Sequence, residues 1–160
     1  MNRLHIREAT PGDAPLILRF IRELAEYERA ISEVSATEAM LAQSLFGPEA
    51  KARCLICEQG EEAIGFALYF YNYSTWQGKY GIYLEDLYIS PEYRGIGAGK
   101  ALLQHIAKIA VDENCGRFEW SVLDWNEPSI RFYESFGAKP KSEWVGYRLS
   151  GDALKNFAGG

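Results

Sequence analysis

The sequence predicts a mixed α/β (α+β) domain in which helices and strands alternate along most of the chain. Some short runs alternate apolar and polar residues as strands do, and others place apolar residues at helical spacing. Breaks containing glycine or proline separate these runs. The chain has 160 residues, of which 48% are hydrophobic and 24% charged. That balance suits one globular domain over residues 1–160.

The first third of the chain predicts one strand followed by two helices. Residues 4–8 alternate like a strand, and the break at residues 10–13 offers a helix N-cap. An amphipathic helix follows, with apolar side chains at Leu16, Ile17, Phe20, Ile21 and Leu24. Ser35, with Glu38 three residues later, resembles a capping box, and we expect it to open a second helix that ends near Gly47.

The rest of the chain predicts five more strands and two more helices. The strands are expected at residues 53–58, 63–73, 81–90, 117–123 and 144–149. A glycine-rich turn at residues 94–99 leads into one helix, and Pro128 suits the first turn of another that stops at Gly137. The order is β-α-α-β-β-β-α-β-α-β, with a parallel crossover around the glycine turn.

Bulk properties argue against several classes of protein. No apolar run approaches the ~20 residues of a membrane span, and the first residues lack the apolar core of a secretion signal. We therefore expect a cytoplasmic protein with no membrane partner. The net charge of −5 counts against a nucleic-acid partner and favours a cationic ligand.

The cysteines predict reduced thiols rather than a metal site. Cys54, Cys57 and Cys115 make an odd count, which suits a reducing compartment. Cys54 and Cys57 form a C-x-x-C pair within a predicted strand, where residues three apart point to opposite faces. No second cysteine pair or histidine cluster completes a zinc site, so we expect no metal.

Residues 93–100, Tyr-Arg-Gly-Ile-Gly-Ala-Gly-Lys, follow a strand and open a helix. Glycines let backbone N–H groups approach a ligand, and a helix N-terminus adds partial positive charge. Together they predict a cradle for a diphosphate, to which Arg94 and Lys100 could add charge. A Walker A loop would need one more residue and a hydroxyl where Ala101 stands. The dinucleotide fingerprint differs in spacing, and a turn that only joins strand to helix is the remaining alternative.

The same turn resembles the R/Q-x-x-G-x-G/A coenzyme A loop of the GNAT acyltransferase superfamily. Other segments are similar to its diamine acetyltransferase branch, which contains spermidine/spermine N1-acetyltransferase and a thialysine-acetylating relative. These segments are residues 73–78, 83–88, 91–95, 122–126 and 132–133. The resemblance runs in register over nearly the whole chain.

This resemblance implies the acyl-CoA N-acyltransferase fold, a bent mixed sheet flanked by helices, with two central parallel strands that splay apart. Acetyl-CoA, the co-substrate, would enter between the strands at 81–90 and 117–123. Backbone groups of Leu87, Tyr88 and Ile89 would pair with its pantetheine arm. The other residues implied in coenzyme binding are Arg94, Gly95, Ile96, Gly97, Ala98, Gly99, Lys100, Asn126 and Ser129. The resemblance also implies a homodimer.

Acetyl transfer to an amine needs a base near the amine and an acid near the sulfur. The resemblance implies Glu85 as the base, acting through an ordered water, and Tyr133 as the acid that protonates the thiolate. Asp86 is expected to attract a cationic substrate. Adjacent strand residues face opposite sides, so we expect only one of Glu85 and Asp86 to point into a given cleft. From the residues alone, Tyr133 is by default one more core aromatic, and the two carboxylates are equally well explained as solvent-facing charges at a strand edge.

The acceptor pocket resembles that of the family less closely. Glu28 matches an acidic position and Trp76 an aromatic position, whereas Ser74 and residues 145–147 replace family carboxylates. We therefore expect a short diamine or a lysine-like amino acid as the acceptor before a long polyamine. We also expect its primary amine to attack directly, in a ternary complex. A protein or peptide N-acetyltransferase and a catalytically idle acyl-CoA-binding sensor remain open alternatives.

Overall fold

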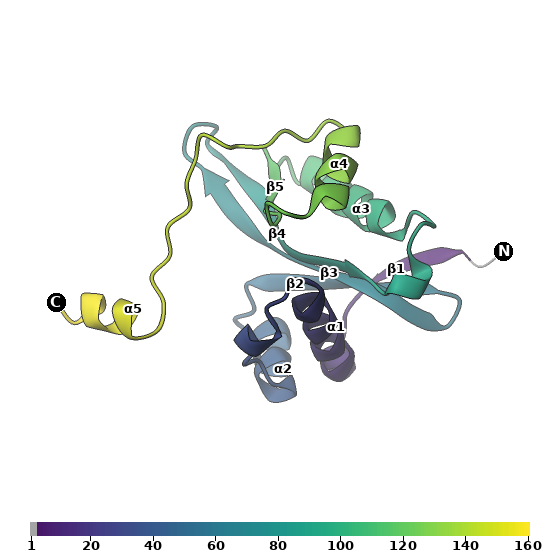
Figure 1. Cartoon of the computed structure of the whole chain (residues 1–160), viewed down its shortest axis with the longest axis horizontal. Helices are drawn as coiled ribbons and strands as arrows, with labels where there is room; N and C mark the ends of the chain where they lie inside the picture. The colour runs from purple at the N-terminus through teal and green to yellow at the C-terminus, as the bar shows by residue number, and fades with distance from the viewer. Residues whose placement is uncertain (1–2) are drawn as a thin grey trace. The chain divides into compact units, whose positions relative to one another are not determined.

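A five-stranded mixed sheet organises the first of two units in the computed structural model, which describes residues 3–160 (Figure 1). The units are Met1–Ser121 and Val122–Gly160. The strands are β1 (Leu4–Glu8), β2 (Ala52–Gln59), β3 (Glu62–Ser74), β4 (Lys79–Ile89) and β5 (Phe118–Trp120). They lie in the order β1-β2-β3-β4-β5.

Three of the four strand pairings are antiparallel, and β4 with β5 is parallel. The parallel pair is joined through helix α3 (Ala98–Asp112), as parallel neighbours require a crossover. This confirms the predicted mixed sheet and the predicted crossover around the glycine turn.

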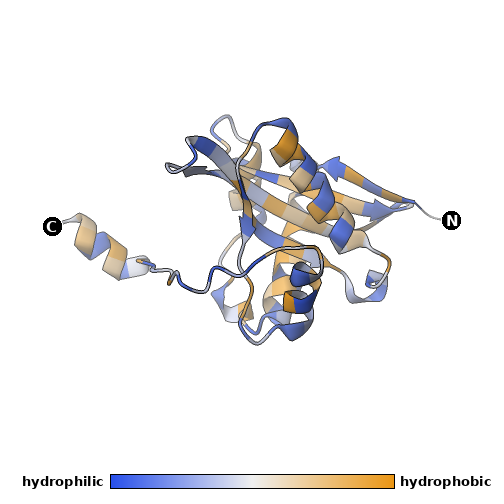
Figure 2. Ribbon diagram, turned by 90° about the horizontal axis from the view of Figure 1, so that it is seen from above, coloured by the Kyte–Doolittle hydropathy of each residue, from blue (hydrophilic) through white to orange (hydrophobic). Residues whose placement is uncertain are grey.

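Helices cover both faces of the sheet in this unit. Figure 1 shows α1 (Ala14–Tyr27) and α2 (Glu38–Phe46) on one face and α3 on the other. Each carries both hydrophobic and hydrophilic residues (Figure 2), so one side of each helix can be buried. Beneath α1, the rings of Phe20 and Phe66 stack with centroids 5.6 Å apart. The buried cluster on this face comprises Ile17, Leu18, Phe20, Leu41, Cys54, Ile56, Phe66 and Tyr88.

Helix α2 begins later than the sequence predicts. Its N-cap is Thr37, whose hydroxyl accepts a hydrogen bond from the Met40 amide at 3.2 Å. The expected capping box at Ser35 is therefore wrong. Thr37 has an extended backbone immediately before the first helical residue, which brings its hydroxyl to a first-turn amide.

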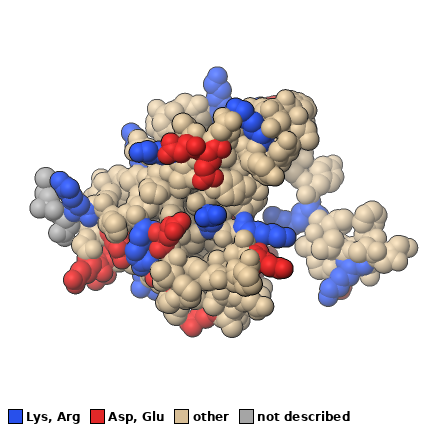
Figure 3. All heavy atoms as spheres, turned by 180° about the vertical axis from the view of Figure 1, so that it is seen from behind, with Lys and Arg blue, Asp and Glu red and all other residues tan. Residues whose placement is uncertain are grey.

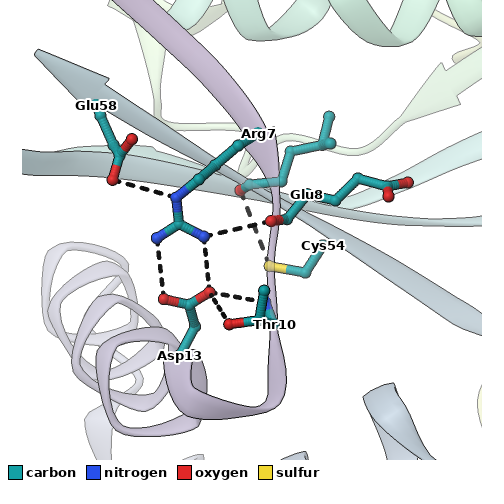
Figure 4. Close-up of polar contacts among 7 residues, drawn as sticks. Arg7, Glu8, Thr10, Asp13, Cys54 and Glu58 are labelled. Atoms are coloured by element: carbon teal, nitrogen blue, oxygen red, sulfur yellow. Dashed lines mark hydrogen bonds and ion pairs between the residues drawn. The ribbon is translucent and has the colours of Figure 1, made fainter.

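Arg7 ties the start of α1 to the sheet. Its Nη1 and Nη2 donate to the two carboxylate oxygens of Asp13 at 2.8 and 3.0 Å, and its Nε donates to Glu58 at 3.1 Å (Figure 4). The Thr10 amide also donates to Asp13, at 2.7 Å. The guanidinium of Arg7 lowers the pKa of Asp13 to about 2. This part of the fold is therefore held by charge as well as by packing.

The second unit holds helices α4 (Glu127–Ser135) and α5 (Gly151–Ala158) and no strand. The strand expected at residues 144–149 is wrong, because those residues form no ladder. β5 is likewise shorter than the predicted 117–123. Alternating residues favour an extended backbone, but a strand also needs a neighbour that supplies hydrogen-bond partners.

Two further observations concern the expected reduced thiols and the expected absence of a membrane span. Cys54 and Cys57 are buried, and all three cysteines are free. Burial raises the pKa of the Cys54 thiol to about 12, which keeps it protonated and unreactive. Within residues 3–160, no helix is both long and apolar enough to cross a bilayer.

Candidate active site

Strand β5 pairs with β4 over only three residues and then ends. Residues 82–84 of β4 lie beside β5, whereas β4 continues to Ile89. Among the described residues, no other strand pairs with β4 on that side. Its backbone from Glu85 onward therefore forms an open edge, which can bind an extended ligand as it would bind another strand. Leu87, Tyr88 and Ile89 lie on this stretch.

A β-bulge interrupts β4 at Glu85. In the register with β3, Asp86 lies opposite Leu68 and Leu84 lies opposite Tyr69, so Glu85 has no partner. A bulge breaks the regular alternation of side chains, and bulges are frequent beside active sites. The expectation that Glu85 and Asp86 face opposite sides assumed an unbroken strand, which the structure does not have here.

Three carboxylates of the first unit interact around this bulge. Glu28 is the C-cap residue of α1, and Glu85 and Asp86 lie on β4. Burial, and to a smaller extent the charges of Glu85 and Glu28, raise the pKa of Asp86 to about 6. Burial, then the charge of Glu85, raises the pKa of Glu28. A bound cation would relieve this repulsion, so the cluster favours a cationic ligand.

The three carboxylates differ in exposure. Glu85 is exposed, whereas Asp86 and Glu28 are half-buried. The half-buried Asp86 is the carboxylate whose pKa rises to about 6. No group of histidine, cysteine and acidic side chains within residues 3–160 has the arrangement of a metal site.

The glycine turn before α3 presents backbone groups without side chains. Gly95 and Gly97 have φ angles of 85° and 86°, a conformation that favours glycine. A Cβ at either position would meet nothing within 4 Å, so the backbone conformation rather than crowding requires glycine. Gly97 is the N-cap of α3 and makes no side-chain cap. The first-turn amides of α3 are therefore available to an anion.

Arg94 and Lys100 flank this turn differently. Arg94 Nε donates to the Ile89 carbonyl at 2.9 Å, and its guanidinium lies over the rings of Tyr27 and Tyr88. Lys100, in the first turn of α3, is exposed. The structure thus places Arg94 against protein groups as well as beside the loop, a position that the spacing of the motif does not reveal.

The remaining predicted coenzyme and acid residues belong to the second unit. The Asn126 side chain is 7% exposed and caps α4 by accepting from the Ser129 amide at 3.4 Å. The Tyr133 ring lies on α4 between Phe132 and Phe136, with centroids 5.6 and 6.4 Å away. The Tyr133 ring therefore packs against two aromatic neighbours at the end of α4.

Trp76 and Ser74 lie at the turn that joins β3 to β4. Trp76 is 85% exposed, whereas Ser74 is 4% exposed. The Ser74 hydroxyl accepts a hydrogen bond from the Gln77 amide at 3.1 Å. Ser74 is therefore a buried turn residue.

Sequence reasoning missed Tyr27 and the bulge at Glu85. Tyr27 directly precedes Glu28, but it follows the helical spacing of α1, and this pattern alone does not distinguish it from an ordinary packing residue. A bulge depends on the register of two strands, and one sequence does not display that register.

Charges elsewhere are mixed in sign. On the face that Figure 3 shows, lysine and arginine side chains are interspersed with aspartate and glutamate. That face therefore presents no continuous basic surface of the kind that binds nucleic acid.

The site thus combines an open edge on β4 with a glycine turn at the start of α3. Residues 18–138 match the model of the Acetyltransferase (GNAT) family. The chain belongs to this family, and it is an N-acetyltransferase.

Known proteins resemble the chain over nearly its whole length. It is 41% identical to thialysine N-epsilon-acetyltransferase of Sus scrofa, over 96% of each chain. It is 34% identical to an L-ornithine N5-acetyltransferase of Arabidopsis thaliana, over 94% of this chain and 86% of the relative. An integron cassette protein from V. cholerae superposes with a TM-score of 0.81 at 28% identity, over 97% of each chain.

Proposed function

We propose that this enzyme transfers the acetyl group of acetyl-CoA to the primary amine of a small cationic acceptor. The observation that carries the proposal is the position of three interacting carboxylates, Glu28, Glu85 and Asp86, on and beside the same strand that leads to the glycine turn. A cation-binding cluster thus adjoins an open strand edge and an anion-binding turn. These are the two charge types of a diamine and a coenzyme diphosphate.

In this proposal, β4 and the turn hold the coenzyme. Backbone groups of Leu87, Tyr88 and Ile89 pair with the pantetheine arm, because this edge lacks a strand partner. The residues assigned to the diphosphate are Arg94, Gly95, Ile96, Gly97, Ala98, Gly99 and Lys100. Asn126 and Ser129 contact the coenzyme at the start of α4. Members of this family generally use acetyl-CoA.

The reaction is direct attack in a ternary complex. Glu85 accepts a proton from the ammonium through an ordered water, and the free amine then attacks the thioester carbonyl carbon. Backbone N–H groups stabilise the negative charge that develops on the carbonyl oxygen. As the carbon–sulfur bond breaks, Tyr133 donates its phenolic proton to the departing thiolate, and the second proton that the attacking nitrogen loses restores the phenol. The products are an N-acetylated amine and the free thiol.

The acceptor is a short diamine, a lysine-like amino acid or a related small amine. Glu28 and Asp86 attract its cationic groups, and Trp76 offers an aromatic face. Ser74 is a buried turn residue, so that turn adds no carboxylate for a long polycation. The names of the thialysine and ornithine relatives agree with an acceptor of this size.

We further propose that residues 1–160 act as one catalytic domain, which works as a cytoplasmic homodimer. The matched family region, residues 18–138, spans the boundary between the two units. Size-exclusion chromatography with light scattering would return twice the mass of 18.1 kDa for this dimer. A monomer at working concentration would contradict it.

A thiol-release assay with acetyl-CoA tests the function over a panel of amines. The panel contains thialysine, ornithine, lysine, short diamines, spermine and peptides. We expect a preference of about tenfold or more for a small amine over peptides, which is about 1.4 kcal/mol in transition-state binding. Preference for peptides would favour a protein acetyltransferase, and coenzyme binding without thiol release would favour a sensor.

A further inference from the structure

The side chain of Arg94 joins three segments of the first unit. Its Nε donates to the Ile89 carbonyl at the end of β4, at 2.9 Å. Its guanidinium carbon lies 5.4 Å from the ring centroid of Tyr27 and 5.6 Å from that of Tyr88. Both distances are within the range of a favourable cation–π contact. Arg94 therefore connects the start of the glycine turn to β4 and to the last residue of α1.

A second contact fixes Tyr88 on α1. Tyr88 is 5% exposed, and its hydroxyl donates to Glu23 Oε1 at 2.9 Å. Glu23 also forms an ion pair with Arg19 at 3.3 Å. The Tyr88 ring is thus held at both ends, and Arg94 lies against a fixed surface rather than a mobile one.

The other end of this connection is the acceptor cluster. Tyr27 is the last residue of α1, and Glu28 is the C-cap residue, whose amide bonds to the Leu24 carbonyl at 2.9 Å. Glu28 interacts in turn with Glu85 and raises the pKa of Asp86. Because Tyr27 and Glu28 are adjacent on one helix end, a displacement of that end moves both.

We propose that Arg94 and Tyr27 are positioning residues that couple coenzyme binding at the glycine turn to amine binding at Glu28. The inference rests on the proposed function, which assigns the coenzyme to the turn and the amine to the carboxylates. A diphosphate held by the turn fixes Arg94, Arg94 holds Tyr27, and Tyr27 holds the end of α1 that carries Glu28. By linkage, each ligand tightens the other by the same factor.

Isothermal titration measures this factor directly. Coenzyme A is titrated into the protein with and without saturating thialysine, and the ratio of the two dissociation constants is the coupling. We expect about a three- to tenfold ratio in the wild type. Tyr27→Leu removes the ring and should bring the ratio to about one, whereas Tyr27→Phe keeps the ring and should keep the ratio.

A second variant and a measurement of melting separate a loss of coupling from a loss of folding. Arg94→Lys keeps a charge but loses the Nε donor and the planar group, so its ratio should also fall. Both leucine and lysine variants are compared at temperatures where their melting curves show full folding. A purely structural role of Tyr27 would lower the melting midpoint of Tyr27→Leu and leave its ratio at the wild-type value, which would overturn the inference.

The outcomes also separate this inference from the proposed function. A wild type that neither binds coenzyme A nor releases thiol with any amine contradicts the proposed function. A wild type that turns over thialysine but shows a ratio of one contradicts the coupling alone. Turnover together with a ratio that falls in Tyr27→Leu and survives in Tyr27→Phe supports both.

Discussion

The glycine turn and the carboxylate cluster lie at opposite ends of the same stretch of β4, and they consist of different chemical groups. The turn at residues 94–100 presents backbone amides and depends on two positive φ angles. The cluster of Glu28, Glu85 and Asp86 presents ionisable side chains and depends on burial and a bulge. One therefore offers a fixed electrostatic environment, whereas the charge of the other changes with pH.

This difference assigns separate tasks to the two regions. Main-chain amides keep their partial charge at any physiological pH, which suits binding of a coenzyme that every turnover requires. In the proposed function, carboxylates that repel each other favour a cationic acceptor and accept its proton. Substitutions in each region should therefore act mainly on one constant, the coenzyme dissociation constant for the turn and the acceptor constants for the cluster.

The largest effect is expected from Glu85→Gln. Loss of the base should lower kcat by about 10²- to 10⁴-fold and leave the dissociation constant of coenzyme A unchanged. Steady-state kinetics and titration calorimetry measure the two quantities separately. A variant that keeps its kcat but loses coenzyme affinity would contradict the assignment of Glu85 as the base.

Gly97→Ala addresses the other region. A left-handed residue with a Cβ costs about 1–2 kcal/mol, so the turn of the free variant should relax to another conformation. Restoring the binding conformation would then lower coenzyme affinity by about 5- to 30-fold. The pH dependence of turnover should stay as in the wild type, because no ionisable group changes. Gly146→Ala is the matched control, since Gly146 has open space and no positive φ. Equal losses in both variants would argue against a special role of the turn.

Asp86 should link acceptor affinity to pH. Its pKa of about 6 lies above its ordinary value, so the folded protein neutralises this carboxyl as pH falls below that point. The KM for a cationic amine should therefore rise as pH falls through about 6, and Asp86→Asn should remove this dependence while raising KM about five- to tenfold. A pH profile of KM that is the same in wild type and variant would contradict the assignment.

The same carboxyl should lower stability. A raised pKa means that the folded state binds more protons than the unfolded state between about pH 4 and 6, so stability falls as pH rises through that window. At pH 7, Asp86→Asn should gain on the order of 1–3 kcal/mol. Differential scanning calorimetry should then show a higher melting midpoint for the variant. A lower midpoint would contradict the destabilising effect assigned to the Asp86 carboxylate.

The smallest effect on activity is expected from Asp13→Asn, outside both regions. The pKa of Asp13 lies at about 2, below its ordinary value, so its ion pair with Arg7 stabilises the fold above about pH 4 and is lost as pH falls toward 2. The variant should lose about 1–2 kcal/mol at pH 7 with kcat and KM unchanged. Chemical denaturation and kinetics test the two parts.

The sequence predicts the fold and the glycine turn better than the carboxylate cluster. Five of the six strands and all four helices predicted for the whole chain are present, and the glycine spacing places the turn at the start of α3. Local patterns determine these features, because amphipathic spacing and positive-φ glycines act within a few residues. The carboxylate cluster combines residues 57 positions apart (Glu28 and Glu85), through a bulge that one sequence does not display.

The failures have the same physical origin. The strand expected at residues 144–149 needs a partner strand, and the N-cap at Thr37 needs a particular backbone conformation. Arg94 matches the coenzyme motif by spacing, yet its contacts with Tyr27 and Tyr88 arise only when α1 packs on β4. Tertiary packing determines the missing strand and the contacts of Arg94, and the local backbone conformation determines the N-cap. Residue spacing records neither.

Backbone amide chemical shifts on titration with coenzyme A test the central assignment most directly. We expect saturable binding of coenzyme A, with the largest chemical-shift changes at the amides of residues 95–100 and along residues 87–89 of β4. Saturable binding whose shifts fall elsewhere, or no binding of coenzyme A at all, would contradict it.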